Sequence, residues 1–309
     1  MNWTKLKEIY KETKLLYPGY GLMPFAKRIT FIAFSLPLLD HVSSWLKADN
    51  NPLLVREFAN LPVIREFFFR PYVNNNWNSV ERMDAITRHY LLVSKCVPIF
   101  DVPLNKCIFL LTFDLNGHHF KVVLHKPDWM VGEGEIALSL FYEDLGEIYS
   151  VMLTLSGTPS NLKLIVGCIQ GVDRDGITDR YRELTKVLFG MRPRDLIVKL
   201  AKILAKDLGC KELLCVSNAA HRSKRWYSKS YKYTCYDTIW IENGGIYKNN
   251  GFYSLSSGIE KRIAKDIPTK KRANYKKRYE FLDQLELQMK QAIDNPSQTK
   301  PIEEAYQKI

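Results

Sequence analysis

The sequence has 309 residues, of which 46% are hydrophobic and 25% charged, and its 16 glycines and 14 prolines are too few for a collagen-like or disordered protein. The formal net charge of +12 favours an anionic partner, which could be nucleic acid, a phosphate-bearing ligand or an acidic membrane face, although plain solubility explains it equally well. The six cysteines form no C-x-x-C pair, so we expect free thiols in a cytoplasmic protein, with no disulfide framework and no metal site.

Residues 1–100 are predicted to form a helical N-terminal region. A charged helix covers Thr4–Leu16, prolines begin two shorter helical segments, and Ser79–Val93 has apolar residues at helical spacing. The apolar run Ile29–Leu39 is eleven residues long, too short to span a bilayer, so we expect no transmembrane segment. A core helix is the default interpretation of this run, and a helix lying on a membrane surface is the alternative.

Residues 101–255 are predicted to form an α+β or mixed α/β domain. An antiparallel strand meander comes first, and Asn116-Gly117 marks its first hairpin. Two amphipathic helices follow, the second between Pro193 and Gly209, and lead to an apolar strand that begins at Leu213. A helical crossover between two buried strands implies a parallel pairing. The five meander strands are Cys107–Leu115, His119–His125, Ile136–Tyr142, Ile148–Leu155 and Leu162–Ile169.

Residues 256–309 are predicted to form a basic loop and a C-terminal helix from Asn274 to about Ile293. The tract from Lys261 to Arg278 holds nine Lys and Arg but a single acid, and tyrosines interleave with it. Such a tract can bind the phosphates of nucleic acid or an anionic lipid surface, but its charges could also be the solvated side of an amphipathic helix. The candidate contacts to an anionic partner are Lys270, Lys271, Arg272, Tyr275, Lys277 and Arg278.

The densest set of functional groups follows the strand at Leu213, where open α/β sheets usually bind their ligands. Nearby cations favour a neutral His221, which could act as a general base oriented by Asp237 or Glu242. Most histidines in such places only pack and hydrogen-bond, and the two carboxylates could instead neutralise arginines. The candidate ligand-binding residues of this stretch are Arg222, Arg225, Tyr236 and Trp240.

Two further positions are candidate phosphate sites. Arg192 and Arg194 flank the predicted N-terminus of the second crossover helix, where free backbone N–H groups favour anions, unless the arginines pair with Asp195 and Glu183. Gln170 and Gly171 follow a buried strand, where glycine permits close backbone approach to a ligand. Acyltransferases of the Gcn5-related class hold the coenzyme A pyrophosphate after a strand meander and before a helix, so acyl-coenzyme A is a possible cofactor. The loop here departs from their Gln/Arg-x-x-Gly-x-Gly/Ala pattern, and its two aspartates would repel phosphate.

Several stretches occur in the order and spacing of one family. They are Arg70-Pro71-Tyr72, His89-Tyr90, Ile169-Gln170-Gly171, Arg182–Leu196, Val216–His221, Tyr236–Gly245 and Thr269–Tyr279. Together they resemble the VirK/YbjX family. The resemblance implies a cytosolic bacterial protein linked to envelope integrity, antimicrobial-peptide resistance and virulence, and it implies no known substrate or catalytic residues. Phe189 stands where similar proteins tend to carry histidine, which argues against an essential acid–base role at that position.

These observations lead to two functional hypotheses. In the first, the α/β domain binds a phosphate-bearing or acyl-coenzyme A-like ligand in a single concavity that brings Arg192, His221 and Asp237 together, and acyltransferase-like activity is an option. In the second, a non-catalytic basic module binds nucleic acid or an anionic membrane. With either hypothesis we expect a cytoplasmic location, with peripheral attachment to the inner membrane face as a variant.

Overall fold

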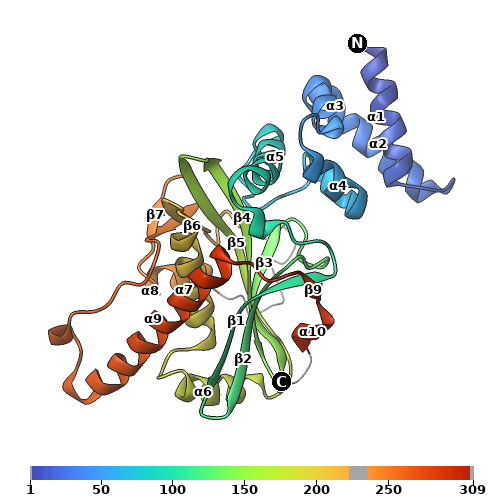
Figure 1. The fold of residues 1–309 in the computed structure, drawn as a ribbon. Helices are drawn as coiled ribbons and strands as arrows, with labels where there is room; N and C mark the ends of the chain where they lie inside the picture. Colours follow the sequence, from blue (N-terminus) through green and yellow to red (C-terminus); the bar gives the residue numbers. More distant parts are fainter. Residues whose placement is uncertain (1, 223–234, 307–309) are drawn as a thin grey trace.

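The computed structural model describes residues 2–222 and 235–306, and within them a nine-stranded sheet forms the centre of the molecule (Figure 1). The strand order across the sheet is β7-β8-β6-β5-β4-β3-β2-β1-β9. The strands are β1 (Lys106–Leu115), β2 (His118–His125), β3 (Ile136–Tyr142), β4 (Gly146–Thr158), β5 (Asn161–Gly171), β6 (Glu212–Val216), β7 (Ile246–Lys248), β8 (Phe252–Leu255) and β9 (Lys300–Pro301).

The predicted meander and the predicted parallel strand are both present. Strands β1 to β5 pair antiparallel in sequence order, and β6 pairs parallel with β5 from Lys163↔Glu212 to Val166↔Cys215. Asn116 and Gly117 both have positive φ, 52° and 80°, as a tight turn between two twisted strands requires. The mixed α+β class is therefore confirmed. Strands β7, β8 and β9, which pair antiparallel with their neighbours, were not predicted.

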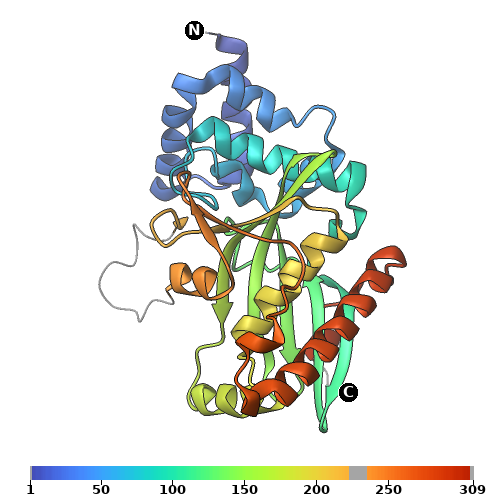
Figure 2. The same cartoon turned by 90° about the vertical axis from the view of Figure 1, so that its left-hand side faces the viewer.

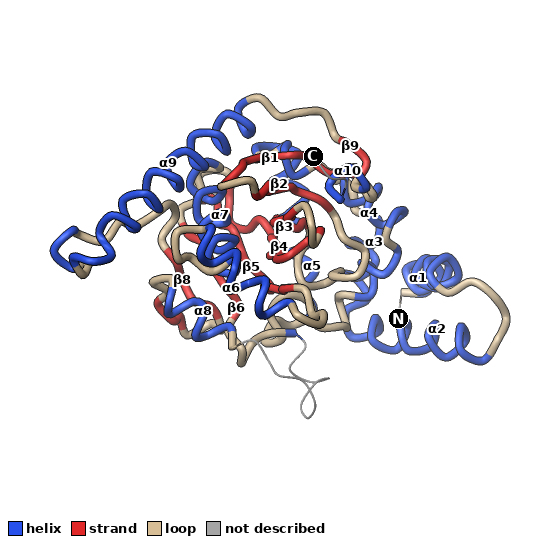
Figure 3. The backbone as a smooth tube through the Cα atoms, turned by 90° about the horizontal axis from the view of Figure 1, so that it is seen from below, coloured by secondary structure: helices blue, strands red, loops and turns tan. Residues whose placement is uncertain are grey.

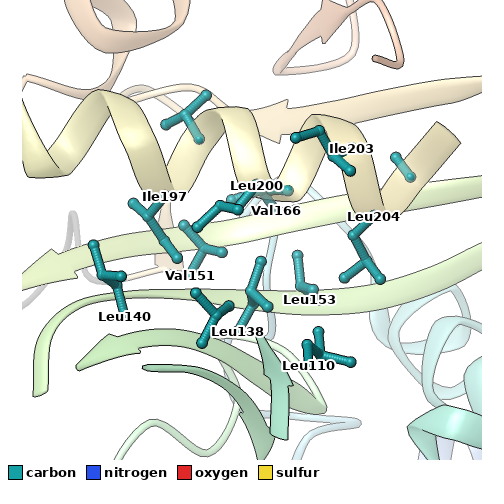
Figure 4. Close-up of a cluster of buried hydrophobic side chains, with 14 of the residues drawn as sticks. Leu110, Leu138, Leu140, Val151, Leu153, Val166, Ile197, Leu200, Ile203 and Leu204 are labelled. Atoms are coloured by element: carbon teal, nitrogen blue, oxygen red, sulfur yellow. The ribbon is translucent and has the colours of Figure 1, made fainter. Parts of the chain in front are cut away.

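Helices α6 (Ile177–Val187) and α7 (Pro193–Asp207) make the crossover, and α7 covers one face of the sheet together with α9 (Arg272–Asp294), as Figure 2 shows. Pro193 occupies the first turn of α7, and Gly209, at φ 72°, follows its end as predicted. The apolar stripe of α7 packs onto inward-facing residues of the sheet (Figure 4). The helix contributes Ile197, Leu200, Ile203 and Leu204 to this contact, and the sheet contributes Leu138, Val151, Leu153 and Val166.

The other face is covered by N-terminal helices. Ile165 of β5 and Val216 of β6 belong to their hydrophobic cluster, whereas Leu164 and Val166 belong to the α7 cluster, as the alternation of a strand requires. The large aromatic side chains Phe58, Phe68 and Tyr72 are buried in this second cluster. Its helices are α1 (Trp3–Leu16), α2 (Leu22–Ser35), α3 (Leu39–Lys47), α4 (Pro52–Asn60) and α5 (Ser79–Cys96).

Helix α2 corrects the default interpretation of the run Ile29–Leu39 as a core helix. Phe31 and Ser35 are its buried residues, and most of its other apolar side chains are exposed. By length and composition, the helical stretch Leu22–Lys47 could cross a membrane, and 11% of its apolar window is buried. All six cysteines are free, as predicted, and four of them are buried.

Candidate functional site

A polar cleft of about 700 Å³ lies between the N-terminal end of α7, the C-terminal end of α8 (Tyr236–Glu242), the loop before α9, and α9 itself. Six cationic side chains line the cleft against three carboxylates, so its walls carry an excess of positive charge. The cations are Arg192, Lys199, Lys202, Lys261, Arg262 and Arg278, and the carboxylates are Asp195, Glu242 and Glu260.

The first wall of the cleft is internally neutralised. Arg192 Nη2 lies 2.6 Å from Glu242 Oε2, and Arg192 Nε lies 2.7 Å from Asp195 Oδ2. Arg194 Nη2 reaches the same Glu242 oxygen at 2.7 Å. Arg192 and Arg194 therefore both pair with Glu242. Glu242 neutralises arginine charge, which was one of the two roles considered for it from the sequence. Pairing with Asp195 is confirmed, whereas Glu183 pairs with Arg180 instead.

The second wall holds two lysines of α7, for which the described residues provide no direct ion pair. Lys199 and Lys202 lie three residues apart, on the same side of the helix. Among the described residues neither ammonium has a carboxylate at ion-pair distance, and residues 223–234 contain no Asp or Glu. Burial lowers the pKa of both lysines. The charge of Lys202 lowers the pKa of Lys199 further, while Asp195 opposes the shift of Lys199 and Glu260 opposes that of Lys202. The pair is therefore a cationic site without a direct ion-pair partner among the described residues, although Asp195 acts on Lys199 and Glu260 on Lys202 from a longer distance.

Helix α9 supplies the third wall through Tyr275 and Arg278. The guanidinium of Arg278 lies over the Tyr275 ring, 4.4 Å from its centroid, and donates to the Phe189 carbonyl oxygen from Nε at 3.1 Å and from Nη2 at 2.7 Å. Asn274 Nδ2 donates to the same oxygen at 2.9 Å. The Phe189 backbone thus connects the turn before α7 to α9, and its ring packs against Phe281 of α9 at 5.7 Å between centroids.

The structure places His221 elsewhere, because the chain turns after β6 toward the loop between β2 and β3. His221 Nε2 lies 2.7 Å from Glu133 Oε2, and its ring meets Tyr236 edge-on at 4.9 Å. Arg222 Nη1 donates to the Val131 carbonyl oxygen. None of these residues lines the cleft. The expected meeting of His221 and Arg192 in a single concavity is therefore not observed.

Three other predicted residues hold α8 against the end of β6. Trp240 is completely buried and donates from Nε1 to the Val216 carbonyl oxygen at 2.8 Å, so it is a core residue and cannot contact a ligand in the cleft. Asp237 Oδ1 accepts from the Asn218 backbone N–H at 2.8 Å, and the Tyr236 N–H donates to Asn218 Oδ1 at 2.9 Å. Through these hydrogen bonds Asp237 and Tyr236 stabilise the position of α8 next to the end of β6.

The remaining predicted residues lie outside the cleft or outside the described part of the chain. Gln170 and Gly171 end β5 and do not line the cleft. A Cβ on Gly171 would come within 2.8 Å of the Tyr149 ring, so this glycine is explained by packing. Arg225 lies outside the described residues. Four residues of the basic tract are exposed away from the cleft, namely Lys270, Lys271, Arg272 and Lys277.

Sequence reasoning missed the two lysines on which the cleft depends. Lys199 and Lys202 interrupt the apolar stretch of α7 at a spacing of three, a signal that could have been noticed. No three His, Cys, Asp or Glu side chains of residues 2–222 and 235–306 gather as ligands of a metal ion. The cleft residues instead suit a ligand that carries several negative charges.

The fold and the cleft define a mixed α+β protein with a cationic cleft on the helical face of its sheet. The family model described as "Protein of unknown function (DUF535)" matches residues 22–291. The chain belongs to this family, which corresponds to the VirK/YbjX family that the sequence resembles.

Two relatives illustrate the family. The chain is 28% identical over 263 residues to the uncharacterized protein YbjX of Escherichia coli (strain K12), covering 82% of this chain and 78% of that protein. It is 29% identical over 229 residues to an uncharacterized protein of Haemophilus influenzae, covering 71% of this chain and 74% of the relative. No solved structure matches.

Proposed function

We propose that this protein binds a phosphate-bearing small molecule in the cleft between α7, α8 and α9. The observation that carries the proposal is the pair Lys199 and Lys202, which face the cleft without a carboxylate partner among the described residues. Desolvating an ammonium group is unfavourable unless an anion compensates it. A bound phosphate would supply that compensation.

The size and lining of the cleft narrow the ligand class. Sites for small molecules typically have volumes of about 300–1,000 Å³, and this cleft, at about 700 Å³, could hold a nucleotide. Arg262 and Arg278 both lie near the Tyr275 ring, at 6.0 Å and 4.4 Å, so two cations stand beside an aromatic surface. Arg262, and the N–H groups of Arg278 that do not donate to Phe189, could bind phosphate oxygens. We therefore favour a nucleotide-like ligand with two or more phosphate groups, a class that includes coenzyme A.

The test compares ligand-induced stabilisation in three proteins. Thermal unfolding of the full chain is measured with ATP, coenzyme A and inorganic pyrophosphate, and repeated for Lys199→Met and for Lys277→Gln, which removes one exposed charge outside the cleft. We expect at least one of these ligands to raise the Tm of the wild type and of Lys277→Gln. The Lys199→Met variant should lose at least about tenfold in affinity, because it lacks a desolvated ion pair. Equal stabilisation of all three proteins, or of none, would contradict the proposal.

Acyl transfer is a second candidate function, and the sheet order favours it. An antiparallel meander, a helical crossover and a parallel strand form the arrangement that we associated with Gcn5-related acyltransferases. In that class the loop between β5 and α6 would approach the coenzyme A pyrophosphate, and His221, paired with Glu133 at 2.7 Å, is the candidate general base. Thiol release from acetyl-coenzyme A in the presence of amine acceptors tests this function. We expect activity that is lost in His221→Ala, and no release above the uncatalysed rate would contradict it.

A further inference from the structure

We infer that helix α2 lies in the surface of an anionic lipid bilayer. Figures 1 and 3 show α1 and α2 at the outer end of the molecule, away from the sheet. Large apolar side chains recur along the outward side of α2, and Leu22, Phe25 and Ile29 are 87%, 58% and 51% exposed. Ala26, Ala33 and Leu36 extend the same stripe at helical spacing. A surface helix of a water-soluble protein normally turns such a stripe inward.

The orientation of α2 is fixed by contacts on its opposite side. Phe31 is completely buried and meets the Phe68 ring edge-on at 5.0 Å. Arg28 Nη2 donates to the carbonyl oxygens of Tyr17 and Gly19, at 2.6 Å and 2.7 Å, which ties the helix to the turn that precedes it. Rotation of α2 to bury its apolar stripe would break all of these contacts. The stripe therefore faces outward in the folded protein.

The positive charge around the apolar stripe of α2 favours an anionic membrane as its partner. Residues 13–39 contain three cations, Lys14, Lys27 and Arg28, and no Asp or Glu. An apolar stripe beside cations suits the acyl chains and the negative head groups of an anionic membrane at once. Tyr20, fully exposed in the turn before α2, is an aromatic residue of the kind that prefers the membrane interface. A second copy of this chain on the stripe would instead bring like charges together.

The stretch that contains α2 lies along the membrane and does not span it. Helix α3, which completes the apolar stretch, is held in the N-terminal core by Val42, Trp45 and Leu46, all of them buried. Asp40 at its start pairs with Lys5 of α1 at 2.7 Å. A spanning orientation would remove α3 from this core, whereas an in-plane orientation requires no change in the fold.

The experiment is co-flotation of the full chain with lipid vesicles. One set of vesicles is pure phosphatidylcholine, and the other contains phosphatidylcholine and phosphatidylglycerol in equal parts. The variant Phe25→Glu/Ile29→Glu places two charges in the stripe, and the control Ile246→Glu/Leu287→Glu places two at sites that are 70% and 60% exposed elsewhere. All four positions are exposed, so both variants should fold, which far-ultraviolet circular dichroism checks.

We expect the wild type and the control to float with the anionic vesicles and to remain unbound with pure phosphatidylcholine. The Phe25→Glu/Ile29→Glu variant should partition at least about tenfold more weakly, because buried apolar area drives interfacial binding. Equal flotation of this variant and the wild type would overturn the inference, since binding would then use another surface. The inference would also be overturned if the wild-type protein did not float with anionic vesicles. Two other results would contradict it: a wild-type dimer that the Phe25→Glu/Ile29→Glu variant abolished, or resistance of the bound protein to alkaline carbonate extraction, as a spanning protein shows.

Discussion

The hydroxyl of Tyr72 donates a hydrogen bond of 2.7 Å to Oε1 of Glu135, a buried carboxylate between the N-terminal helices and the sheet. Tyr90 donates to the second oxygen of the same group. Lys126 continues the network by pairing with Glu57 at 2.7 Å. Burial raises the pKa of Glu135, and the neighbouring Lys126 charge and tyrosine hydroxyls oppose that shift. Both tyrosines belong to stretches that resemble the family, and this network explains why they stand there.

Removing one hydroxyl from this network should weaken the whole fold. Tyr72→Phe leaves one oxygen of Glu135 without its donor, and the free energy of unfolding should fall by about 1–3 kcal/mol. Urea unfolding followed by circular dichroism measures the change. Tyr247→Phe, at an exposed position in β7, is the matched control and should change stability by less than about 0.5 kcal/mol. Equal effects of the two substitutions would show that the buried network contributes nothing specific.

Replacing a lysine of the cleft should stabilise the unliganded protein. Lys202 is buried, and its pKa is lowered from 10.5 mainly by desolvation. At neutral pH the unfolded chain holds this proton more tightly than the folded chain does, so the charge opposes folding. Lys202→Met should therefore raise the free energy of unfolding by about 1 kcal/mol, while ligand affinity falls.

The same substitution should change the pH dependence of stability. Between the lowered pKa of Lys202 and 10.5 the unfolded state binds more protons, so this lysine makes wild-type stability rise with pH through that window. The advantage of Lys202→Met should accordingly shrink as pH approaches 10.5. Guanidinium unfolding of both proteins from neutral to alkaline pH measures the difference. A difference that stayed constant would mean that Lys202 titrates alike in the folded and unfolded states.

Substitution of Trp240 should affect stability without affecting the ligand. Trp240→Phe removes the donor to the Val216 carbonyl oxygen and part of a buried ring, at a cost of about 2 kcal/mol. Trp129→Phe, at a position 57% exposed, serves as the control and should be nearly neutral. Isothermal titration with the ligand found above should give an affinity within about twofold of wild type for both variants. A loss of affinity in Trp240→Phe but not in Trp129→Phe would contradict this prediction and would show that Trp240 contributes to ligand binding.

Neutralising the exposed part of the basic tract separates the two functional hypotheses. Lys270, Lys271 and Arg272 lie outside the cleft, so Lys270→Gln/Lys271→Gln/Arg272→Gln should keep the small-molecule affinity within about twofold. Filter binding to RNA at two salt concentrations tests the rival module. Salt-sensitive RNA binding by the wild type that this triple variant abolishes would favour the module over the cleft.

Much of the fold could be predicted because its signals are local. The hairpin at Asn116-Gly117, the stripe of α7 and its flanking Pro193 and Gly209 each depend on residues close together in the chain. The strands that escaped prediction are short: β7 has three residues and β9 has two, too few for a period to emerge. The interpretation of α2 as a core helix was wrong because periodicity locates an apolar stripe but not the side on which the core lies.

The candidate site was predicted only in part, because the sequence does not show in which direction the chain continues after a strand. Arg192 and Glu242 are fifty residues apart, and they do meet. His221 follows the same strand as Glu242 but turns toward the loop that carries Glu133, while α8 carries Glu242 toward α7. Which way a chain turns after a strand depends on contacts with distant segments, and these leave no local pattern.

The bond from α9 to the carbonyl of Phe189 bears on how this position can vary. Phe189 has φ 54°, a left-handed conformation that non-glycine residues seldom adopt and in which histidine is enriched. Histidine and phenylalanine can both hold that backbone shape, and the hydrogen bonds from α9 go to the main-chain carbonyl, while the Phe189 ring packs against Phe281 of α9 at 5.7 Å between centroids. A ring exchange at this turn, from phenyl to imidazole, would thus leave the hydrogen-bonded anchor of α9 intact and change only the ring contact with Phe281.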